Sequence, residues 1–279
     1  MEYITLANGV KMPLLGYGVY QVDPAECERC VTDAIAVGYR SIDTAQAYHN
    51  EEGVGNAVRK SGLPREDFFL TTKVWISNGG YEKAKASIDE SLAKLQTDYI
   101  DLLLIHQPFN DYYGTWRAME EAYKAGKLRA IGVSNFRPHH LKALLETEVA
   151  PMVNQIEFHP GCQQRETLAF CRDHGILVEA WSPLGRGRVL DHPTLTAIAQ
   201  NHGKTPAQIC LRWCLEQGVL PLPKSVTPAR MAENGDLFTF ALTPEEMDQL
   251  HALDTGKGSH DPDAPGVAEM LLSAYDVHA

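Results

Sequence analysis

Four side chains of different chemical types stand where they could act together on a carbonyl group. Asp43, Lys73 and His106 each fall at the end of an apolar run, and Tyr48 follows the first of these runs. Tyrosine titrates at about pH 10 in water, so a phenol that donates a proton near neutral pH needs help from neighbouring charges. We expect Lys73 to lower the Tyr48 pKa and Asp43 to keep a buried Lys73 protonated. A hydrogen bond from His106 would polarise a carbonyl oxygen as negative charge develops on it.

Each of these residues also has an ordinary structural interpretation when it is taken alone. A carboxylate that ends a strand commonly serves a turn or an ion pair, and a lone tyrosine commonly packs. A lone lysine extends along the surface with its charge in water. The coincidence of the four types is what predicts a proton-donor assembly, suited to reduction of a carbonyl by hydride.

The segment around Asp43 and Tyr48 predicts a strand, a loop and a helix. Residues 40–43 form a short alternating run after Gly38, which ends the preceding helix. Asn50 precedes two glutamates and suits the N-cap of the next helix. The loop between them would hold the carboxylate and the phenol on opposite sides of one turn.

Eight apolar runs alternate with helical patterns along the chain, without a low-complexity linker. This alternation predicts βα units and a parallel sheet. Eight units favour a closed (β/α)8 barrel over an open doubly wound sheet, and no G-x-G-x-x-G fingerprint follows a predicted strand. The loops after the strands would then converge on one mouth. We expect the strands over 14–20, 40–43, 68–74, 100–105, 130–133, 153–158, 177–181 and 219–222.

Turn and cap signals surround these strands. Asn8-Gly9 between two apolar segments predicts a two-residue hairpin that caps one end of the fold. Asp23 is expected to cap the first helix, because a proline follows it. The same pattern predicts helix starts at Thr205, Thr227 and Thr243.

Composition narrows the class of protein. The chain has 279 residues, 44% of them hydrophobic, and a formal net charge of -11, which argues against a broad nucleic-acid footprint. No basic leader and no run of about 20 apolar residues is present, so we expect a cytoplasmic protein. Cys27 and Cys30 lie in a helical pattern without a second pair at zinc-like spacing, which predicts reduced thiols and no metal.

Four segments carry a resemblance to a known family that covers nearly all of the chain: GYRSIDTAQAYHNEEGVG, DYIDLLLIH, GKLRAIGVSNF and LPKSVTPARMAEN. They resemble the aldo-keto reductase superfamily. The resemblance implies one monomeric barrel domain over residues 1–279, which uses NADPH to reduce aldehydes and ketones without a metal. Its catalytic tetrad would be Asp43, Tyr48, Lys73 and His106, with Tyr48 as the general acid.

The resemblance also implies an NADPH site. Its members would follow the cofactor from the nicotinamide through the pyrophosphate and the 2′-phosphate to the adenine: Ser134, Asn135, Gln155 and Trp181; Ser182, Leu184 and Gly185; Lys224, Ser225, Val226, Thr227 and Arg230; and Glu233 and Asn234. The position of Lys224 and Arg230 independently supports their assignment to the 2′-phosphate. They flank a predicted helix start, where free N–H groups and the helix dipole favour an anion.

The substrate pocket departs from the family pattern. Gln107 follows the catalytic histidine, where the family often has tryptophan, so one wall would be less aromatic. Trp75 and Tyr20 are expected to line the pocket, with Trp116 near the same mouth, although each of the three could equally lie at the surface or pack between helices. The short tail over 256–279 suggests a loosely covered pocket with broad tolerance. Trp181 stands where many relatives carry tyrosine. With this residue and its motifs, the chain resembles the bacterial branch of 2,5-diketo-D-gluconate reductases and prostaglandin F synthase-like enzymes.

The predicted function is therefore NADPH-dependent reduction of a small carbonyl substrate, without nucleic-acid or membrane partners. Two other classes of function remain at this point. One is an NADPH-binding redox sensor with slow turnover, similar to the related channel subunits. The other is a barrel lyase or isomerase in which Lys73 forms a Schiff base.

Overall fold

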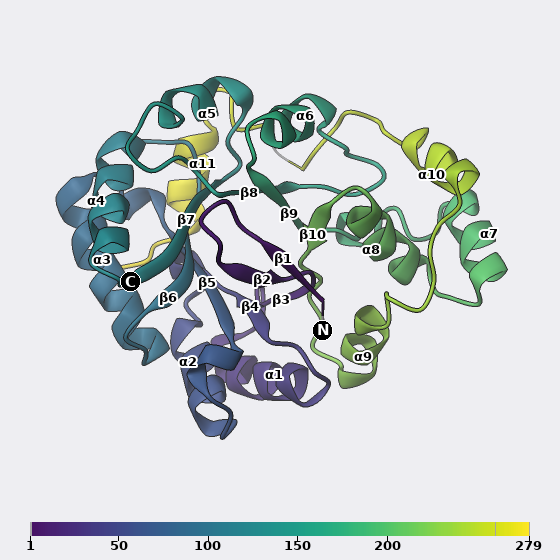
Figure 1. Ribbon diagram of the computed structural model, residues 1–279, viewed down its shortest axis with the longest axis horizontal. Coiled ribbons are helices and arrows are strands. Elements are labelled where there is room, and N and C mark those ends of the chain that lie inside the picture. The colour runs from purple at the N-terminus through teal and green to yellow at the C-terminus, as the bar shows by residue number, and fades with distance from the viewer. Residues whose placement is uncertain (1, 260, 279) are drawn as a thin grey trace.

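The computed structural model describes residues 2–259 and 261–278. Eight parallel strands form one sheet in which neighbours along the chain are neighbours in space (Figure 1). The Gly18 N–H donates to the Pro223 oxygen at 3.1 Å and so joins the first strand to the segment after the last. The strands are β3 (Gly16–Gly18), β4 (Ser41–Asp43), β5 (Phe69–Val74), β6 (Ile100–Ile105), β7 (Leu128–Ser134), β8 (Val153–Glu157), β9 (Leu177–Trp181) and β10 (Val219–Pro221). The predicted (β/α)8 barrel is confirmed.

Helices surround the sheet on its outer face, as Figure 1 shows. None of the helices described here is long and apolar enough to cross a membrane. The helices are α1 (Pro24–Ala36), α2 (Glu51–Lys60), α3 (Tyr81–Leu95), α4 (Tyr112–Lys124), α5 (Pro138–Leu144), α6 (Arg165–Asp173), α7 (Pro193–His202), α8 (Pro206–Glu216), α9 (Pro228–Gly235), α10 (Pro244–His251) and α11 (Val267–Ala274).

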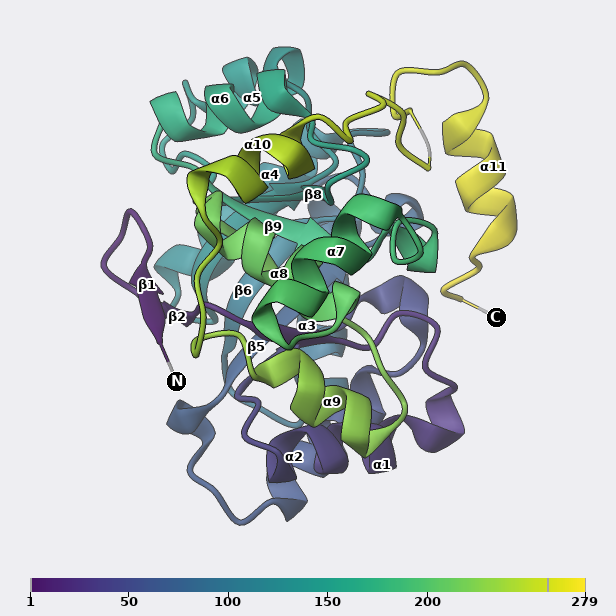
Figure 2. The same ribbon diagram turned by 90° about the vertical axis from the view of Figure 1, so that its right-hand side faces the viewer.

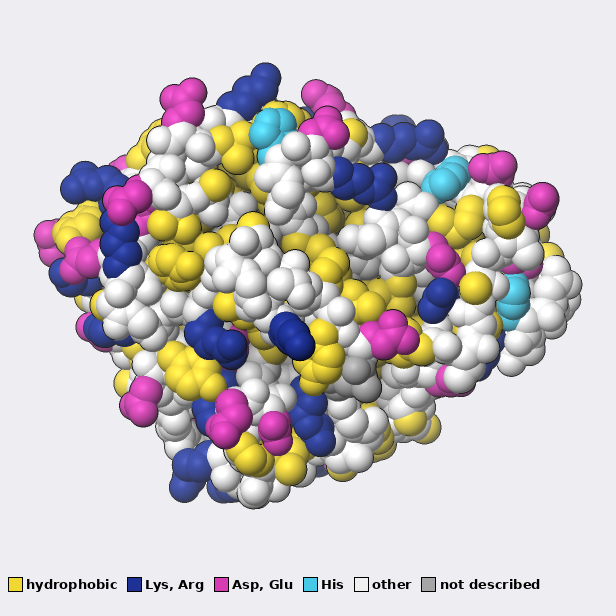
Figure 3. All heavy atoms as spheres, viewed as in Figure 1, with side chains coloured by type: hydrophobic (Ala, Val, Ile, Leu, Met, Phe, Trp, Pro, Cys, Tyr) yellow, Lys and Arg dark blue, Asp and Glu magenta, His cyan; other side chains and the backbone are white. Residues whose placement is uncertain are grey.

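An N-terminal hairpin closes one end of the barrel, as predicted. Its loop is one residue longer than the two predicted, because Thr5 pairs with Lys11 and the Leu6 N–H donates to the Val10 oxygen at 2.8 Å. Its strands β1 (Tyr3–Thr5) and β2 (Lys11–Pro13) pair antiparallel, and Leu6 and Met12 pack into an apolar cluster inside the barrel. Figure 2 shows this hairpin and α11 at opposite ends of the molecule. On the hairpin face, basic and acidic side chains lie interspersed (Figure 3). The barrel floor is therefore sealed, and the opposite end is left for a site.

The predicted caps of three helices form. Asp23 accepts from the Ala25 N–H at 2.9 Å, and Thr205 and Thr243 build reciprocal capping boxes with Gln208 and Glu246. These bonds satisfy N–H groups that a helix leaves without a partner in its first turn. Helices α1, α8 and α10 therefore begin at the proline that follows each cap.

Asn50 and Thr227 occupy the predicted N-cap positions of α2 and α9, but neither side chain makes the capping hydrogen bond. The Asn50 amide is buried and donates to the backbone oxygens of Val19 and Val22, so it bridges two loops instead of capping α2. The Thr227 side chain caps nothing; its N–H donates to the Ser225 hydroxyl at 3.0 Å. At Asn50 the side-chain oxygen that would cap α2 instead accepts from the Thr44 hydroxyl at 2.7 Å.

Trp116 belongs to the core and does not line the mouth. Its side chain on α4 has no exposed surface, and its indole N–H donates to Thr147 Oγ1 at 3.0 Å and to the Val149 oxygen at 3.1 Å. Of the positions that the sequence leaves open for this tryptophan, packing between helices is correct.

Candidate active site

The predicted catalytic side chains meet at the carboxyl end of the barrel strands, beside a cavity of about 500 Å³. Asp43 ends β4, Lys73 stands one residue before the end of β5, and His106 follows β6. Tyr48 ends the short 3₁₀ helix η1 (Gln46–Tyr48), which stops at His49, a left-handed residue with φ 55°. Parallel strands bring these separate chain segments to one edge, as a barrel requires.

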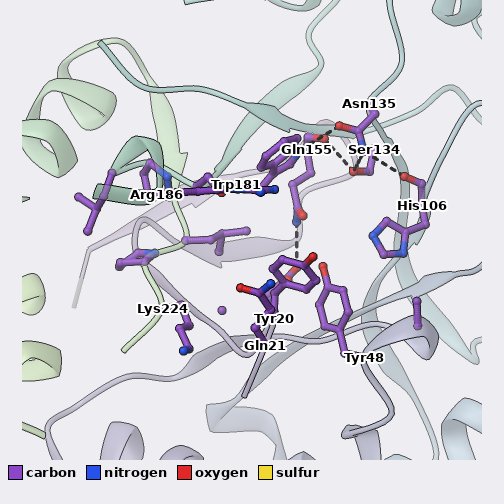
Figure 4. Close-up of a pocket in the computed structure, with 18 of the residues that line it drawn as sticks. Tyr20, Gln21, Tyr48, His106, Ser134, Asn135, Gln155, Trp181, Arg186 and Lys224 are labelled. Atoms are coloured by element: carbon purple, nitrogen blue, oxygen red, sulfur yellow. Dashed lines mark hydrogen bonds between the residues drawn. The ribbon is translucent and has the colours of Figure 1, made fainter. Parts of the chain in front are cut away.

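Lys73 is the centre of a buried polar cluster. Its Nζ donates to Asp43 Oδ1 at 2.6 Å and to the Thr44 oxygen at 2.8 Å, and lies 3.5 Å from Tyr48 Oη. Lys73 has no exposed surface and does not line the cavity. Tyr48 and His106 both line it. Their rings face one another edge-on with centroids 5.6 Å apart (Figure 4). The phenol and the imidazole therefore face the cavity, and Lys73 lies behind the phenol.

The expected lowering of the Tyr48 pKa is wrong for this structure. Burial raises the pKa of Tyr48 well above its ordinary value, and the Asp43 carboxylate raises it further. The shortest hydrogen bond of Lys73 is the one to Asp43, so the Asp43 carboxylate largely compensates the positive charge of Lys73. Tyr48 is consequently a neutral phenol, which is the protonated form that a general acid needs.

An interlocked set of polar side chains continues the cavity wall. The Ser134 hydroxyl donates to the Gln155 backbone oxygen at 2.8 Å, and the Asn135 amide donates to the Ser134 hydroxyl at 3.0 Å. The same amide donates to the His106 oxygen at 3.1 Å, and the Trp181 indole donates to Asn135 Oδ1 at 2.8 Å. Figure 4 shows these side chains linked beside His106. The bonds hold the ends of β6, β7, β8 and β9 together.

The Gln155 side chain is anchored to two buried acids. Its Nε2 donates to Asp43 Oδ2 at 2.8 Å and to Glu179 Oε2 at 3.1 Å. Gln155 lines the cavity, and no described residue donates to its Oε1. A hydrogen-bond acceptor is thus available at the cavity wall.

Two exposed cations stand near the other end of the cavity. Lys224 lines the cavity, at the side of Figure 4 opposite His106, and Arg230 lies on α9. Neither forms an ion pair with any residue that the structure describes. The Tyr17 hydroxyl donates to the Ser225 oxygen at 2.5 Å and fixes the segment between them. In a chain of net charge -11, two cations without a paired carboxylate are a local excess of positive charge.

Aromatic side chains form the remaining wall. Tyr20, Trp75 and Gln107 line the cavity, and the tail adds Tyr275. The Tyr20 and Tyr275 hydroxyls are 2.6 Å apart, and the Trp75 indole donates to the Tyr275 oxygen at 3.1 Å. Gln107 Oε1 is buried without a partner among the described residues. One polar acceptor therefore interrupts an otherwise aromatic surface.

Comparison with known proteins places the chain in a family. Residues 9–255 match the Aldo/keto reductase family. The chain belongs to the aldo/keto reductase family. It is 52% identical over 255 residues to glyoxal reductase of Bacillus subtilis, a match that covers 90% of this chain and 92% of that protein.

Two further members of the family are informative. Methylglyoxal reductase DkgA of Escherichia coli is 46% identical over 270 residues, which cover 94% of this chain and 98% of that protein. The crystal structure of a Bombyx mori aldo-keto reductase in complex with NADP has a TM-score of 0.88 at 35% identity, and the match covers 95% of each chain. The resemblance stated from the sequence motifs is confirmed at the level of the family.

The cofactor residues predicted for this aldo/keto reductase fall into two groups. Seven line the cavity: Ser134, Asn135, Gln155, Trp181, Ser182, Leu184 and Lys224. Seven lie outside its lining: Gly185, Ser225, Val226, Thr227, Arg230, Glu233 and Asn234. Among the second group, the Glu233 carboxylate already accepts from the Thr205 hydroxyl at 2.8 Å. The contacts of both groups with a cofactor stay predictions.

Several cavity residues escaped the sequence analysis. Tyr275 and Leu271 come from the tail, whose path over the mouth no periodic pattern announces. Gln21 and Arg186 reach the cavity from left-handed backbone conformations, with φ 57° and 55°. Glu179 did carry a signal, because a glutamate inside the apolar run of β9 is a charge in a buried strand.

Proposed function

We propose that this chain is an NADPH-dependent carbonyl reductase that converts aldehydes, ketoaldehydes or keto-sugars into alcohols, with Tyr48 as proton donor. The observation that carries the proposal is a neutral, half-buried phenol that lies beside His106 at the cavity and next to the Lys73–Asp43 pair. Membership of the family and the similarity to glyoxal and methylglyoxal reductases support carbonyl reduction.

The residues present fit the cofactor, and a similar chain is known in complex with NADP. Gln155 Oε1 offers an acceptor to a carboxamide N–H at the inner end of the cavity. At the other end Lys224 and Arg230 carry uncompensated charge beside the start of α9. This arrangement suits a 2′-phosphate and favours NADPH over NADH.

Each catalytic side chain has a separate task. NADPH supplies the hydride that reaches the carbonyl carbon. Tyr48 delivers its proton to the carbonyl oxygen, and His106 donates a hydrogen bond that orients this oxygen. Lys73 compensates the phenolate that Tyr48 becomes, and Asp43 keeps Lys73 charged in its buried position. No metal is needed for this division of tasks.

The cavity wall favours small carbonyl compounds with a polar end. Trp75, Tyr20 and Tyr275 narrow the mouth beside the phenol, while Gln107 places a polar amide on the wall. Such a wall suits ketoaldehydes and keto-sugars, which carry a second oxygen that can bond to an amide. The names of the glyoxal and methylglyoxal reductases agree with this size class.

The Schiff-base alternative finds no support in the position of Lys73. Its Nζ makes three hydrogen bonds within the protein, the side chain has no exposed surface, and it is absent from the cavity lining. A lysine that attacks a carbonyl must reach the substrate with a free amine. Lys73 instead supports Tyr48 from behind.

The test is consumption of NADPH, with NADH in parallel, against methylglyoxal, glyoxal, nitrobenzaldehyde and 2,5-diketo-D-gluconate. We expect turnover with a clear NADPH preference. Tight NADPH binding without turnover of any substrate would contradict the proposal and favour the redox-sensor function. Sedimentation of the same preparation would test the predicted monomer.

A further inference from the structure

Glu179 is a buried acid that the proposed chemistry does not use. It stands in the middle of β9, has no exposed surface, and does not line the cavity. Its Oε2 accepts the Gln155 N–H at 3.1 Å, and its Oε1 has no hydrogen-bond partner among the described residues. A buried carboxyl group is costly unless it is hydrogen-bonded or neutral, so its presence here calls for a role.

The role follows from the geometry of the Gln155 amide. Its NH₂ group has two hydrogens, and it donates to Asp43 and to Glu179. Because the amide group is planar, two fixed N–H bonds fix its plane. The carbonyl oxygen is then turned away from both acids, whose oxygens would repel it. Removing the Glu179 acceptor would leave the amide free to rotate about its bond to Asp43.

We propose that Glu179 is a positioning residue for the hydride-transfer site. It holds the second N–H of Gln155, so that the Gln155 oxygen stays aimed at the nicotinamide carboxamide and Asp43 keeps its other oxygen on Lys73. Glu179 touches neither the cofactor nor the substrate and acts through Gln155. The inference rests on the proposed function, since it assigns the Gln155 oxygen to the cofactor.

The charges around Glu179 support a neutral acid. Burial raises the pKa of Glu179 to about 8, and Asp43 of β4 raises it as well, whereas the Gln155 bond from β8 and Lys73 of β5 act in the opposite direction. The other neighbouring strand, β10, adds only Val219, Leu220 and Pro221. A neutral Glu179 leaves the Lys73–Asp43 ion pair without a second buried anion beside it.

Ionisation of Glu179 would change which form of the cofactor, reduced or oxidised, the site binds more tightly. A second negative charge near the nicotinamide stabilises the positively charged oxidised ring relative to the neutral reduced ring. A neutral Glu179 therefore suits binding of NADPH and reduction. As the pH rises through about 8, we expect the affinity for NADPH to fall relative to that for NADP⁺.

The experiment compares Glu179→Leu and Glu179→Gln with the wild type. Leucine removes the acceptor at similar volume, so we expect the NADPH dissociation constant and KM to rise roughly ten-fold at pH 7, with a smaller change in kcat. Glutamine keeps an acceptor oxygen and should restore NADPH affinity to within about two- to three-fold of the wild type. This rescue separates positioning from mere filling of space.

The dependence of cofactor affinity on pH is measured with a second buried acid, Glu51, as the control. Glu51 on α2 is buried, accepts from Thr72 Oγ1 at 2.6 Å, and has a pKa that burial raises, but it does not line the cavity. We expect the NADPH-to-NADP⁺ affinity ratio to change near pH 8 in the wild type and in Glu51→Gln. In Glu179→Gln the change should be absent, because no proton is left to lose.

Two results would overturn the role of Glu179. One is wild-type NADPH affinity in a folded Glu179→Leu protein, and the other is a pH 8 transition that persists in Glu179→Gln. If the leucine variant does not fold, Glu179→Met takes its place in the affinity comparison, because a thioether is only a weak acceptor. A wild type that binds NADPH but reduces no carbonyl counts against the proposed function instead, and the binding comparison still tests Glu179.

Discussion

The catalytic end of the cavity is formed by Asp43, Tyr48, Lys73 and His106. These side chains are buried or half-buried, and Lys73 hydrogen-bonds to Asp43 and Tyr48. At the rim, formed by Lys224, Arg230 and the tail with Tyr275, the side chains are exposed or only half-buried. The tail helix α11 has no buried residue, and the exposed Asp261 and Asp263 tie the segment before it to Arg137 at 2.7 and 3.2 Å.

The contrast assigns different properties to the two regions. A buried and mutually bonded cluster is organised before the substrate arrives, which is what stabilisation of a developing charge requires. A rim of exposed ion pairs contributes little to stability and opens at low cost. We therefore expect substitutions at the catalytic end to abolish chemistry or folding, and substitutions at the rim to change affinity and choice of ligand.

The largest effect is expected for Tyr48→Phe. Loss of the proposed general acid should lower kcat by roughly 10²- to 10⁴-fold, while NADPH binding measured by fluorescence stays near wild type. Tyr39→Phe is the control, since that tyrosine is buried outside the cavity and donates to the Met231 oxygen at 3.1 Å. Full turnover by Tyr48→Phe would remove Tyr48 from the mechanism.

Lys73→Met tests the buried ion pair. The substitution leaves Asp43 buried without a countercharge, which should lower the free energy of unfolding by about 3–5 kcal/mol and reduce turnover. The exposed pair between Lys85 and Glu121, at 2.5 Å, gives the matched control, and Lys85→Met should leave the urea midpoint near wild type. Equal midpoints for the two variants would mean that the catalytic end is no more rigid than the surface.

The sequence predicted the catalytic end better than the rim, and the reason is physical. Residues that end buried parallel strands must converge, so Asp43, Lys73 and His106 could be brought together from apolar runs alone. The direction of the Tyr48 pKa could not, because it depends on how deeply η1 is buried. Periodicity locates a residue on an element but does not measure its solvent exposure.

The rim escaped prediction for another reason. The path of α11 depends on a few long-range contacts, such as the Tyr20–Tyr275 pair, that leave no periodic signal in the sequence. The helix start at Asn50 was predicted correctly but its capping bond was not, because the Thr44 hydroxyl and the loop after β3 take the Asn50 side chain. Side chains that choose between nearby partners of equal chemistry are decided by tertiary structure.

Arg230→Ala probes the rim for cofactor choice. Loss of a charge-assisted contact worth about 1.5 kcal/mol should weaken NADPH binding roughly ten-fold and leave NADH binding unchanged. Because Arg230 lies outside the cavity lining, kcat at saturating NADPH should stay near wild type. Arg59→Ala on α2, also exposed, is the control. An unchanged NADPH dissociation constant would place the 2′-phosphate elsewhere.

The smallest effect is expected for Tyr275→Phe at the cover of the cavity. The substitution removes the hydroxyl that lies 2.6 Å from Tyr20 and keeps the ring that packs edge-on against Trp75, with centroids 5.4 Å apart. A half-buried neutral hydrogen bond contributes about 0.5–1.5 kcal/mol, so KM for carbonyl substrates should rise by a few-fold at most, with kcat unchanged. Tyr113→Phe, at an exposed ring on α4, controls for loss of a hydroxyl elsewhere. A large fall in kcat would show that the tail orders the catalytic end, and the division between a fixed catalytic end and an adjustable rim would then fail.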